Sequence, residues 1–138
     1  MVEFKEIDFK ENERNIIAFL DAHQTEATGV EQAIPTHFSI GAYDGTKYIG
    51  GITANNWMNT THISLLAVDT EYRKDGLGSN LLIQAENYAK SQNAEIITIH
   101  TQDYQAKTFY EKHSYHVLGK LPNSPFKGTT KYYLAKQL

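Results

Sequence analysis

The sequence predicts an α/β fold in which a mixed β-sheet is flanked by helices, within a single domain over residues 1–138. Strand-like and helix-like segments alternate in the second half of the chain, and such a strand–helix–strand order makes a parallel pair by a right-handed crossover. Two β-prone runs in the first half meet at a tight turn and predict an antiparallel hairpin. The length of 138 residues suits one domain.

The first half of the chain is expected to hold one strand, one helix and three further strands. In order, these segments are strand 2–8 (VEFKEID), helix 12–23, loop 25–36, hairpin 37–56 and strand 61–69. The first strand rests on the alternation of apolar and polar residues. The helix places Ile16, Ile17, Phe19 and Leu20 on one side, and the pair Asp44-Gly45 suits the turn of the hairpin.

The second half is expected to follow the order helix, strand, helix, strand, strand. These segments are helix 76–92, strand 94–101, helix 104–113, strand 114–121 and strand 131–138. The long helix is predicted by a stripe of apolar residues at helical spacing, formed by Leu77, Leu81, Leu82, Ala85, Tyr88 and Ala89. Gln92-Asn93 is expected to end this helix.

Composition excludes several function classes. The chain has no cysteine, which excludes disulfides, cysteine nucleophiles and zinc-thiolate sites. No apolar run approaches the roughly 18–20 residues that span a bilayer, and the first residues are too acidic for a signal peptide, so we expect a cytoplasmic protein without membrane contact. Only two arginines are present, which argues against nucleic acid as a partner. The histidines lack metal-ligand spacing, so no metal is expected.

Charge is spread unevenly over the net value of −3. Residues 1–36 carry three cations and eight acids, whereas residues 104–138 carry six lysines and one acid. The acidic segment could favour a cationic ligand, and a solvated acidic surface is the alternative interpretation.

The segment EYRKDGLGSN, residues 71–80, has the Gly-x-Gly spacing of a phosphate-binding loop. Gly76 and Gly78 permit positive φ and lack the Cβ atoms that would keep a ligand from backbone N–H groups. At the start of a helix these N–H groups have no intrahelical acceptor and lie at the positive end of the helix dipole, which suits phosphate oxygens. Ser79 can add a hydroxyl, and Asp75 is expected to be the N-cap residue. A plain glycine-rich turn is the alternative.

Other phosphate-binding motifs do not fit this loop. A P-loop requires Gly-x4-Gly-Lys-Ser/Thr, which is absent from the sequence. A dinucleotide fingerprint requires a third glycine where Leu81 stands, and an acid at the end of the next strand, which ends in His100-Thr101.

Two segments together resemble motifs of the GNAT superfamily of N-acetyltransferases. LLAVDTEYRKDGLGSNLL is similar to motif A, which has Arg/Gln-x-x-Gly-x-Gly/Ala after a strand, and YQAKTFYEKHSYHVLG is similar to motif B, which has Ala-x-x-Phe/Leu-Tyr-Glu-Lys-x-Gly-Phe/Tyr. The motifs stand in the correct order, and the resemblance covers about residues 37–136. The string Tyr104-Gln105-Ala106 and the tail from Pro125 to Tyr132 also resemble a branch of small bacterial members.

This resemblance implies a mostly antiparallel central sheet with one parallel pair, which splays at a bulge where acetyl-CoA binds. The backbone of Leu66, Ala67 and Val68 would pair with the pantetheine arm and position the thioester. Tyr110 would be the general acid that protonates the departing thiolate, since a phenol with a pKa of about 10 stays protonated at pH 7. The pyrophosphate would be held by Arg73, Lys74, Asp75, Gly76, Leu77, Gly78 and Ser79.

The sequence departs from motif B at two positions. Asp103 stands where the family usually has Asn, which weakens the expectation of a side-chain contact to the cofactor there. Ser114 replaces a Gly and implies a strained or altered helix end. The general base is left open among His62, His100 and a water molecule, and packing beside Phe109 is the alternative role for Tyr110.

The resulting hypothesis is an acetyl-CoA-dependent N-acetyltransferase. It would transfer the acetyl group to a primary amine of a small molecule or a peptide, by direct attack in a ternary complex. One alternative is a non-catalytic module of the same fold that binds acyl-CoA as a sensor or structural subunit, and another is a nucleotide-binding protein. The acceptor pocket is expected to be built by segment 22–36, turn 55–60 and loop 121–128. A homodimer is one option, because many relatives are dimers.

Overall fold

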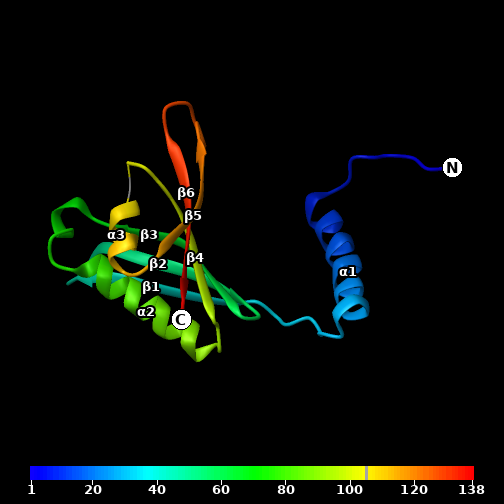
Figure 1. Ribbon diagram of the computed structural model, residues 1–138, viewed down its shortest axis with the longest axis horizontal. Coiled ribbons are helices and arrows are strands. Elements are labelled where there is room, and N and C mark those ends of the chain that lie inside the picture. The colour runs from blue at the N-terminus through cyan, green and yellow to red at the C-terminus, as the bar shows by residue number, and fades with distance from the viewer. Residues whose placement is uncertain (105) are drawn as a thin grey trace. The chain divides into compact units, whose positions relative to one another are not determined.

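The computed structural model describes residues 1–104 and 106–138, which form two compact units, residues 1–34 and residues 35–138. Gln105, which is part of the string that resembles small bacterial members, lies outside the described residues. Figure 1 shows the helix of the first unit and the sheet of the second.

The first unit consists of one helix, α1 (Phe9–Thr28), preceded by an extended segment. The Asp8 carboxylate accepts a hydrogen bond of 3.1 Å from the Glu11 N–H group, and Gly29 ends the helix with a left-handed φ of 72°. The helix therefore starts earlier and ends later than the sequence indicated.

The predicted strand at residues 2–8 is wrong. These residues are exposed and have no strand assignment, and the six-stranded sheet does not include them. Alternation of apolar and polar residues indicates only that one face could be buried, whereas a strand also needs a neighbour for its backbone N–H and C=O groups.

The second unit is built on a six-stranded sheet in the order β1-β2-β3-β4-β6-β5. Every neighbouring pair is antiparallel except β3 and β4, which are parallel. This mixed, mostly antiparallel sheet confirms the predicted fold class. The strands are β1 (Thr36–Asp44), β2 (Lys47–Trp57), β3 (Thr60–Val68), β4 (Ile96–Gln102), β5 (His116–Pro122) and β6 (Thr130–Gln137).

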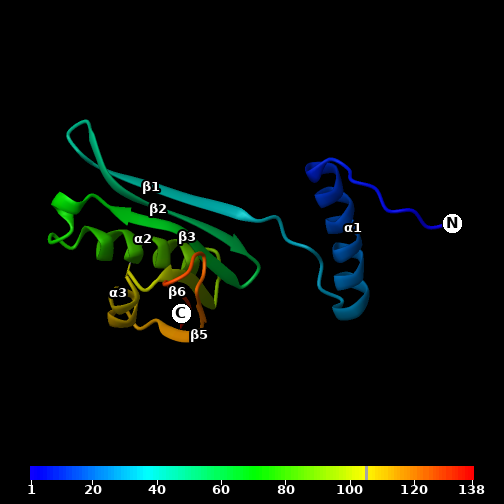
Figure 2. The ribbon, with the colours of Figure 1, turned by 90° about the horizontal axis from the view of Figure 1, so that it is seen from above.

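Two α-helices lie on one face of this sheet, as Figure 2 shows. The longer one, α2 (Leu77–Ser91), buries Leu81, Leu82, Ala85 and Ala89 against β2 and β3, which confirms its predicted apolar stripe. The helix ends at Gln92 as predicted, and Asn93 follows with a left-handed φ of 61°. A short helix, α3 (Lys107–Lys112), follows β4, and one 3₁₀ turn, η1 (Thr70–Tyr72), follows β3.

The core of the second unit is the layer between α2 and the sheet. Its largest fully buried apolar side chains come from β2, β3, α2, β4 and β6, namely Ile52, Ile63, Leu81, Leu82, Ile97 and Leu134. Since side chains alternate along a strand, the residues next to these, such as His62, Thr98 and His100, face the side of the sheet opposite α2. Within the described part of the chain, no helix is long and apolar enough to cross a membrane.

Candidate active site

The parallel strands β3 and β4 stay paired over only a short stretch. Their register runs from Thr60 opposite Ile96 to His62 opposite Thr98 and goes no further. Immediately beyond, Leu65 and Ile63 of β3 pair with the consecutive residues Thr53 and Ala54 of β2, so Ser64 is the extra residue of a β-bulge. We call the stretch beyond this point, residues 63–68 of β3 and 99–102 of β4, the β3–β4 divergence. Its position confirms the expected splay of the parallel pair at a bulge.

Beyond the bulge, β3 directs some backbone groups toward the divergence, where no neighbouring strand of the described sheet pairs with them. The Asp69 N–H group donates to the Ile49 carbonyl at 2.8 Å, which makes these two residues a hydrogen-bonded pair. Because such pairs alternate along an antiparallel ladder, Ala67 directs its N–H and C=O groups toward Gly51 of β2. Leu66 and Val68 therefore direct theirs away from β2, toward the divergence. Of the three predicted backbone positions, only Leu66 and Val68 face the expected place of a ligand.

The loop that follows β3 is tied to the sheet by its own acids. Asp69 accepts a hydrogen bond of 2.9 Å from the Glu71 N–H group, and the Glu71 carboxylate lies 3.5 Å from the Lys47 ammonium. The Tyr72 hydroxyl donates to the Asp44 carboxylate at 2.6 Å, and this bond raises the pKa of Tyr72 to about 12. These contacts hold the loop against the β1–β2 hairpin.

The start of α2 differs from the prediction in one respect. Its N-cap residue is Gly76, with a left-handed φ of 72°, and no side chain caps the helix. The predicted capping role of Asp75 is therefore wrong. A residue with positive φ at the N-cap position turns the chain so that the preceding side chain does not reach the first turn, and Asp75 is exposed. The N–H groups of Leu77, Gly78 and Ser79 have no intrahelical acceptor, since the first bond inside the helix runs from the Asn80 N–H group to the Gly76 carbonyl, at 3.0 Å.

The two glycines of the loop have different functions. Position 76 favours glycine because its φ is left-handed, whereas Gly78 has ordinary helical geometry. A Cβ atom at Gly78 would lie 3.5 Å from the Phe109 ring and 3.8 Å from a Val68 methyl group. Gly78 thus keeps open the space where the end of β3, the start of α2 and the side of α3 meet.

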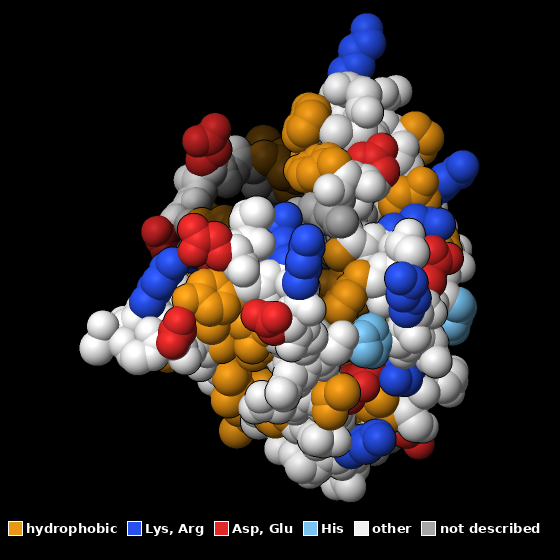
Figure 3. Space-filling view, turned by 90° about the vertical axis from the view of Figure 1, so that its left-hand side faces the viewer, with side chains coloured by type: hydrophobic (Ala, Val, Ile, Leu, Met, Phe, Trp, Pro, Cys, Tyr) orange, Lys and Arg blue, Asp and Glu red, His pale blue; other side chains and the backbone are white. Residues whose placement is uncertain are grey.

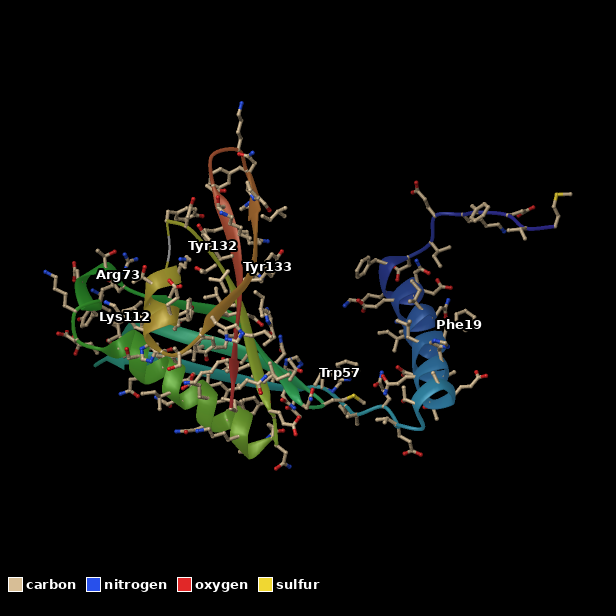
Figure 4. All side chains as sticks on the ribbon, in the orientation of Figure 1. Phe19, Trp57, Arg73, Lys112, Tyr132 and Tyr133 are labelled. Carbon is tan, nitrogen blue, oxygen red and sulfur yellow. The ribbon has the colours of Figure 1, made fainter. Side chains whose placement is uncertain are left out.

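The basic side chains of the loop are exposed. The Arg73 Nε–H group donates to the Val68 carbonyl at 3.2 Å, which connects the loop to the divergence, and Figure 4 shows Arg73 on this loop. Figure 3 shows this side of the molecule, where Lys and Arg side chains are interspersed with acids and do not form one large basic patch. Backbone N–H groups, with Arg73 and Lys74 beside them, are therefore the main anion-binding groups available here.

His113 lies next to the loop, and the sequence did not indicate it. Its Nε2 atom lies 2.9 Å from the Ser79 hydroxyl, and its ring packs 4.9 Å from the ring of Phe109. Ser79 and His113 come from different helices, so only the packing of α3 against α2 brings them together. The helix end beside His113 is unusual, since Ser114 adopts a left-handed φ of 72°, as expected where a glycine of the motif is replaced.

Tyr110 is the most buried side chain of α3, with 4% of its surface exposed. Its ring packs edge-on against Phe109 and Tyr115, with centroids 5.1 and 5.8 Å away. Burial raises the pKa of Tyr110 well above its usual value of 10. The phenol is therefore protonated at neutral pH, which a proton donor requires and which packing alone also explains.

A hollow of about 260 Å³ lies beside the start of α3. Lys107 bridges its rim, with its ammonium 3.2 Å from Glu111 and 5.2 Å from the centre of the Tyr132 ring. Asp103 is held at the edge, because its carboxylate accepts from the Thr130 N–H group at 3.1 Å. This bond gives Asp103 a structural role at the end of β4. The lining consists of Asp103, Ala106, Lys107, Thr108, Phe109 and Tyr132.

The two candidate bases, His62 and His100, lie close together on the face of the sheet opposite α2. The rings of His62 and His100 lie 5.5 Å apart, and the ring of Tyr133 lies 5.9 Å from that of His100. Figure 4 labels Tyr132 and Tyr133, which are successive residues of β6 and therefore point to opposite faces. In the described part of the chain, no group of three or more His, Asp or Glu side chains could hold a metal ion.

Comparison with known proteins identifies the family and the fold. The model of the acetyltransferase (GNAT) domain family matches residues 7–127. The blasticidin-S acetyltransferase of Streptomyces morookaense is 34% identical over 90 residues, which are 64% of this chain and 65% of that protein. The match thus spans slightly less than two thirds of that relative's length.

Solved structures show the same fold. An acetyltransferase from Bacillus cereus superposes with a TM-score of 0.86 at 27% identity, over 99% of this chain and 98% of that one. A protein assigned as a streptothricin acetyltransferase from Bacillus anthracis, solved with acetyl coenzyme A, superposes with a TM-score of 0.66 at 28% identity, over 76% of this chain and 64% of that one. With the family model covering most of its length, this chain belongs to the GNAT family of acetyltransferases.

Proposed function

We propose that this chain transfers the acetyl group of acetyl-CoA to a primary amine. The observation that carries the proposal is the presence of two sets of backbone groups without a backbone partner in the described part of the chain. The first set belongs to Leu66 and Val68 in the β3–β4 divergence, and the second consists of the N–H groups in the first turn of α2. An extended acyl thioester with a pyrophosphate at its far end has the shape and polarity to match these two sets.

The residues of this region fit acetyl-CoA. The N–H groups of Leu77, Gly78 and Ser79, with Arg73 and Lys74 beside them, would hold the pyrophosphate. The acid Glu71 is occupied by Lys47, and Asp75 does not bind the helix start, so neither takes the anion's place. When bound, acetyl-CoA supplies an activated acyl group, and Leu66 and Val68 would orient it through their backbone groups.

Tyr110 is proposed as the acid that donates a proton to the departing sulfur. Burial raises the pKa of Tyr110, so the phenol carries its proton at neutral pH when the sulfur departs. The chain has no cysteine, so no acyl-cysteine intermediate can form, and we propose direct attack of the amine in a ternary complex.

A primary amine on a small molecule is the acceptor class that we propose first. The names of two relatives, a blasticidin-S acetyltransferase and a protein assigned as a streptothricin acetyltransferase, support it. A peptide amine is the second candidate. The acidic segment 1–36 supports a cationic acceptor, in which case the apparent acceptor affinity should weaken as salt is raised.

The test is release of free thiol from acetyl-CoA in the presence of amines. The panel contains blasticidin S, an aminoglycoside, a polyamine, amino acids and a peptide N-terminus. Amine-dependent thiol release is expected, with a mass increase of one acetyl group on the amine. Stabilisation by coenzyme A without thiol release for any amine would instead favour a non-catalytic acyl-CoA sensor. Stabilisation by ATP and not by coenzyme A would favour a nucleotide-binding protein.

We also propose that residues 1–138 act as one GNAT domain, located in the cytoplasm. The family model, which runs from residue 7 to residue 127, includes residues of both compact units and supports this proposal. Limited proteolysis tests the domain assignment. If residues 1–138 form a single domain, proteases should not release a stable fragment 35–138.

A homodimer is proposed from the surface of α1. Within the first unit this helix carries an apolar stripe at helical spacing, formed by Phe9, Ile16, Ile17 and Leu20, and such a stripe favours a partner surface. Sedimentation should give twice the chain mass of 15.6 kDa, and Ile16→Glu with Ile17→Glu should return it to the monomer. A monomer for the unmodified chain would contradict the proposal.

A further inference from the structure

His62 occupies the last paired position before the two strands separate. It is opposite Thr98 in the β3–β4 register, and the bulge at Ser64 follows. Along an extended strand of about 3.3 Å per residue, His62 lies roughly 13 Å from Leu66, measured between Cα atoms. An imidazole at one end of this span and a thioester at the other leave room for an amine and one water molecule.

The His62 ring is fixed by a hydrogen bond at only one of its nitrogen atoms. Nδ1 lies 2.9 Å from the Thr98 hydroxyl, and no contact is recorded for Nε2 within the described residues. When Nδ1 carries the hydrogen and donates it, Nε2 is the basic nitrogen. The ring is therefore oriented, and its proton-accepting atom is available.

The surroundings of His62 favour the neutral ring. Burial is the main cause that lowers the pKa of His62 below its usual 6.5. The nearby His100 lowers this pKa further, and a hydrogen bond to the Thr98 backbone opposes the shift. On the neighbouring strands the ring meets Thr98 and His100 of β4 and faces Asn55 of β2 in the register. Tyr133 of β6 lies behind His100, with the Lys131 ammonium 6.0 Å from its ring centre. None of these groups is a carboxylate that would hold a proton on His62.

The carboxylates of the second unit are engaged elsewhere, which leaves few other bases. Seven of the eight acids in residues 35–138 have a recorded hydrogen bond or ion pair, and the eighth, Asp75, is exposed beside the start of α2. The seven and their contacts are Asp44 with Tyr72, Asp69 with Glu71 N–H, Glu71 with Lys47, Glu86 with Lys136, Glu95 with Asn59, Asp103 with Thr130 N–H and Glu111 with Lys107.

We propose that His62 is the general base of the reaction and that its Nε2 atom takes the proton of the acceptor ammonium, directly or through one water molecule. This inference rests on the proposed acetyl transfer. The R–NH3+ group gives one proton to Nε2, and the free amine pair forms the C–N bond as the C–S bond breaks. The second amine proton leaves to solvent, the thiolate takes a proton from Tyr110 or water, and the imidazolium returns its proton to solvent. His100 is a positioning residue, which acts by lowering the pKa of His62.

The first test needs no acceptor. Nitrogen-15 NMR of the full chain, labelled at histidine, should show His62 with its hydrogen on Nδ1 and with a pKa below 6.5. A hydrogen on Nε2 would overturn the proposal, because Nε2 would then have no free electron pair to accept a proton while Nδ1 is taken up by Thr98.

The second test uses His62→Asn, whose side-chain amide can keep the bond to Thr98 but has no atom in place of Nε2. With acetyl-CoA and the amine of highest rate from the panel, starting with blasticidin S, kcat/KM should fall by at least 10²-fold, within the usual range for positioned proton transfer. Coenzyme A affinity should stay within twofold. If His62→Asn fails to fold, His62→Gln takes its place.

The dependence of activity on pH distinguishes a general base from a residue with a structural role. In the unmodified chain, activity should decline as pH falls below the lowered pKa of His62, and this acid limb should vanish in His62→Asn. His100→Gln should move the limb to higher pH, because it removes a group that lowers the pKa of His62. His116→Gln is the matched control, since His116 is exposed at the start of β5, which pairs with neither β3 nor β4, and it should change neither rate nor limb.

A rate loss of less than threefold in His62→Asn, with the acid limb kept, would overturn the role of His62 while acetyl transfer stands. No thiol release by the unmodified chain with any amine would overturn the proposed function itself, and the role of His62 with it.

Discussion

Replacing Gly78 by alanine should make the protein more stable and weaken its binding of coenzyme A. The added Cβ lies 3.5 and 3.6 Å from two Phe109 ring atoms and 3.8 Å from a Val68 methyl group, all ordinary contacts, so the chain need not rearrange. Gly78 has helical geometry, and alanine there should stabilise the fold by about 0.5–1 kcal/mol. For a unit of this size, that corresponds to roughly 2–5 °C in Tm.

The same methyl group fills the space between the end of β3 and the first turn of α2. If the pyrophosphate sits there, at least one hydrogen bond to a charged group should be lost, worth about 1.5–3 kcal/mol. The Kd for coenzyme A should then rise by roughly 10- to 100-fold. Gly78→Val, with two more carbons, should abolish binding while the chain stays folded.

Calorimetric titration with coenzyme A and thermal unfolding without it measure the two effects separately. Gly119→Ala is the matched control, because a Cβ atom there meets nothing within 4 Å and β5 is remote from the loop in the sheet order. Unchanged coenzyme A affinity in Gly78→Ala would refute the placement of the pyrophosphate. A fall in Tm would refute the packing argument.

Three further predictions concern buried or capping groups. Tyr110→Phe should lower kcat by about 10²-fold with coenzyme A affinity kept, and a loss below threefold in steady-state assays would favour a packing role. Lys136→Met should destabilise the fold by about 2 kcal/mol, since Lys136 lies 3.0 Å from Glu86, whose side chain is only 10% exposed, and a change below 0.5 kcal/mol in urea unfolding would contradict this. Asp103→Asn should change stability by less than about 0.5 kcal/mol, because an amide oxygen can still accept from the Thr130 N–H group, whereas Asp103→Ala should lose about 1 kcal/mol in the same assay.

Local patterns predicted the elements of the second unit well. The hairpin between β1 and β2, the apolar stripe of α2 and the end of that helix at Gln92 all follow from residues near one another in the chain. The exact conformation of the hairpin turn does not follow from the residue pair Asp44-Gly45. Its two loop residues are Gly45 and Thr46, between Asp44 and Lys47, and the positive φ falls on Gly45 alone.

Errors arose where a pattern needed a partner elsewhere. The segment VEFKEID alternates as a strand does, yet no strand of the described sheet pairs with it. Asp75 stands directly before Gly76 at a typical capping position, yet the left-handed φ of Gly76 makes the glycine itself the N-cap. In both cases the backbone path decided the outcome, and residue type alone does not specify that path.

The sequence by itself determined the fold class, the order of elements in residues 37–138, the glycine-rich loop before α2 and the family, because these depend on short-range spacing. Only the tertiary structure decided which backbone groups of β3 face the divergence, that Ser79 meets His113, and that His62 and His100 share one face of the sheet. Those relations depend on the register of β3 with β2 and β4 and on the packing of α3 against α2. A shift of one residue in strand register would turn the groups of β3 and β4 to the opposite side.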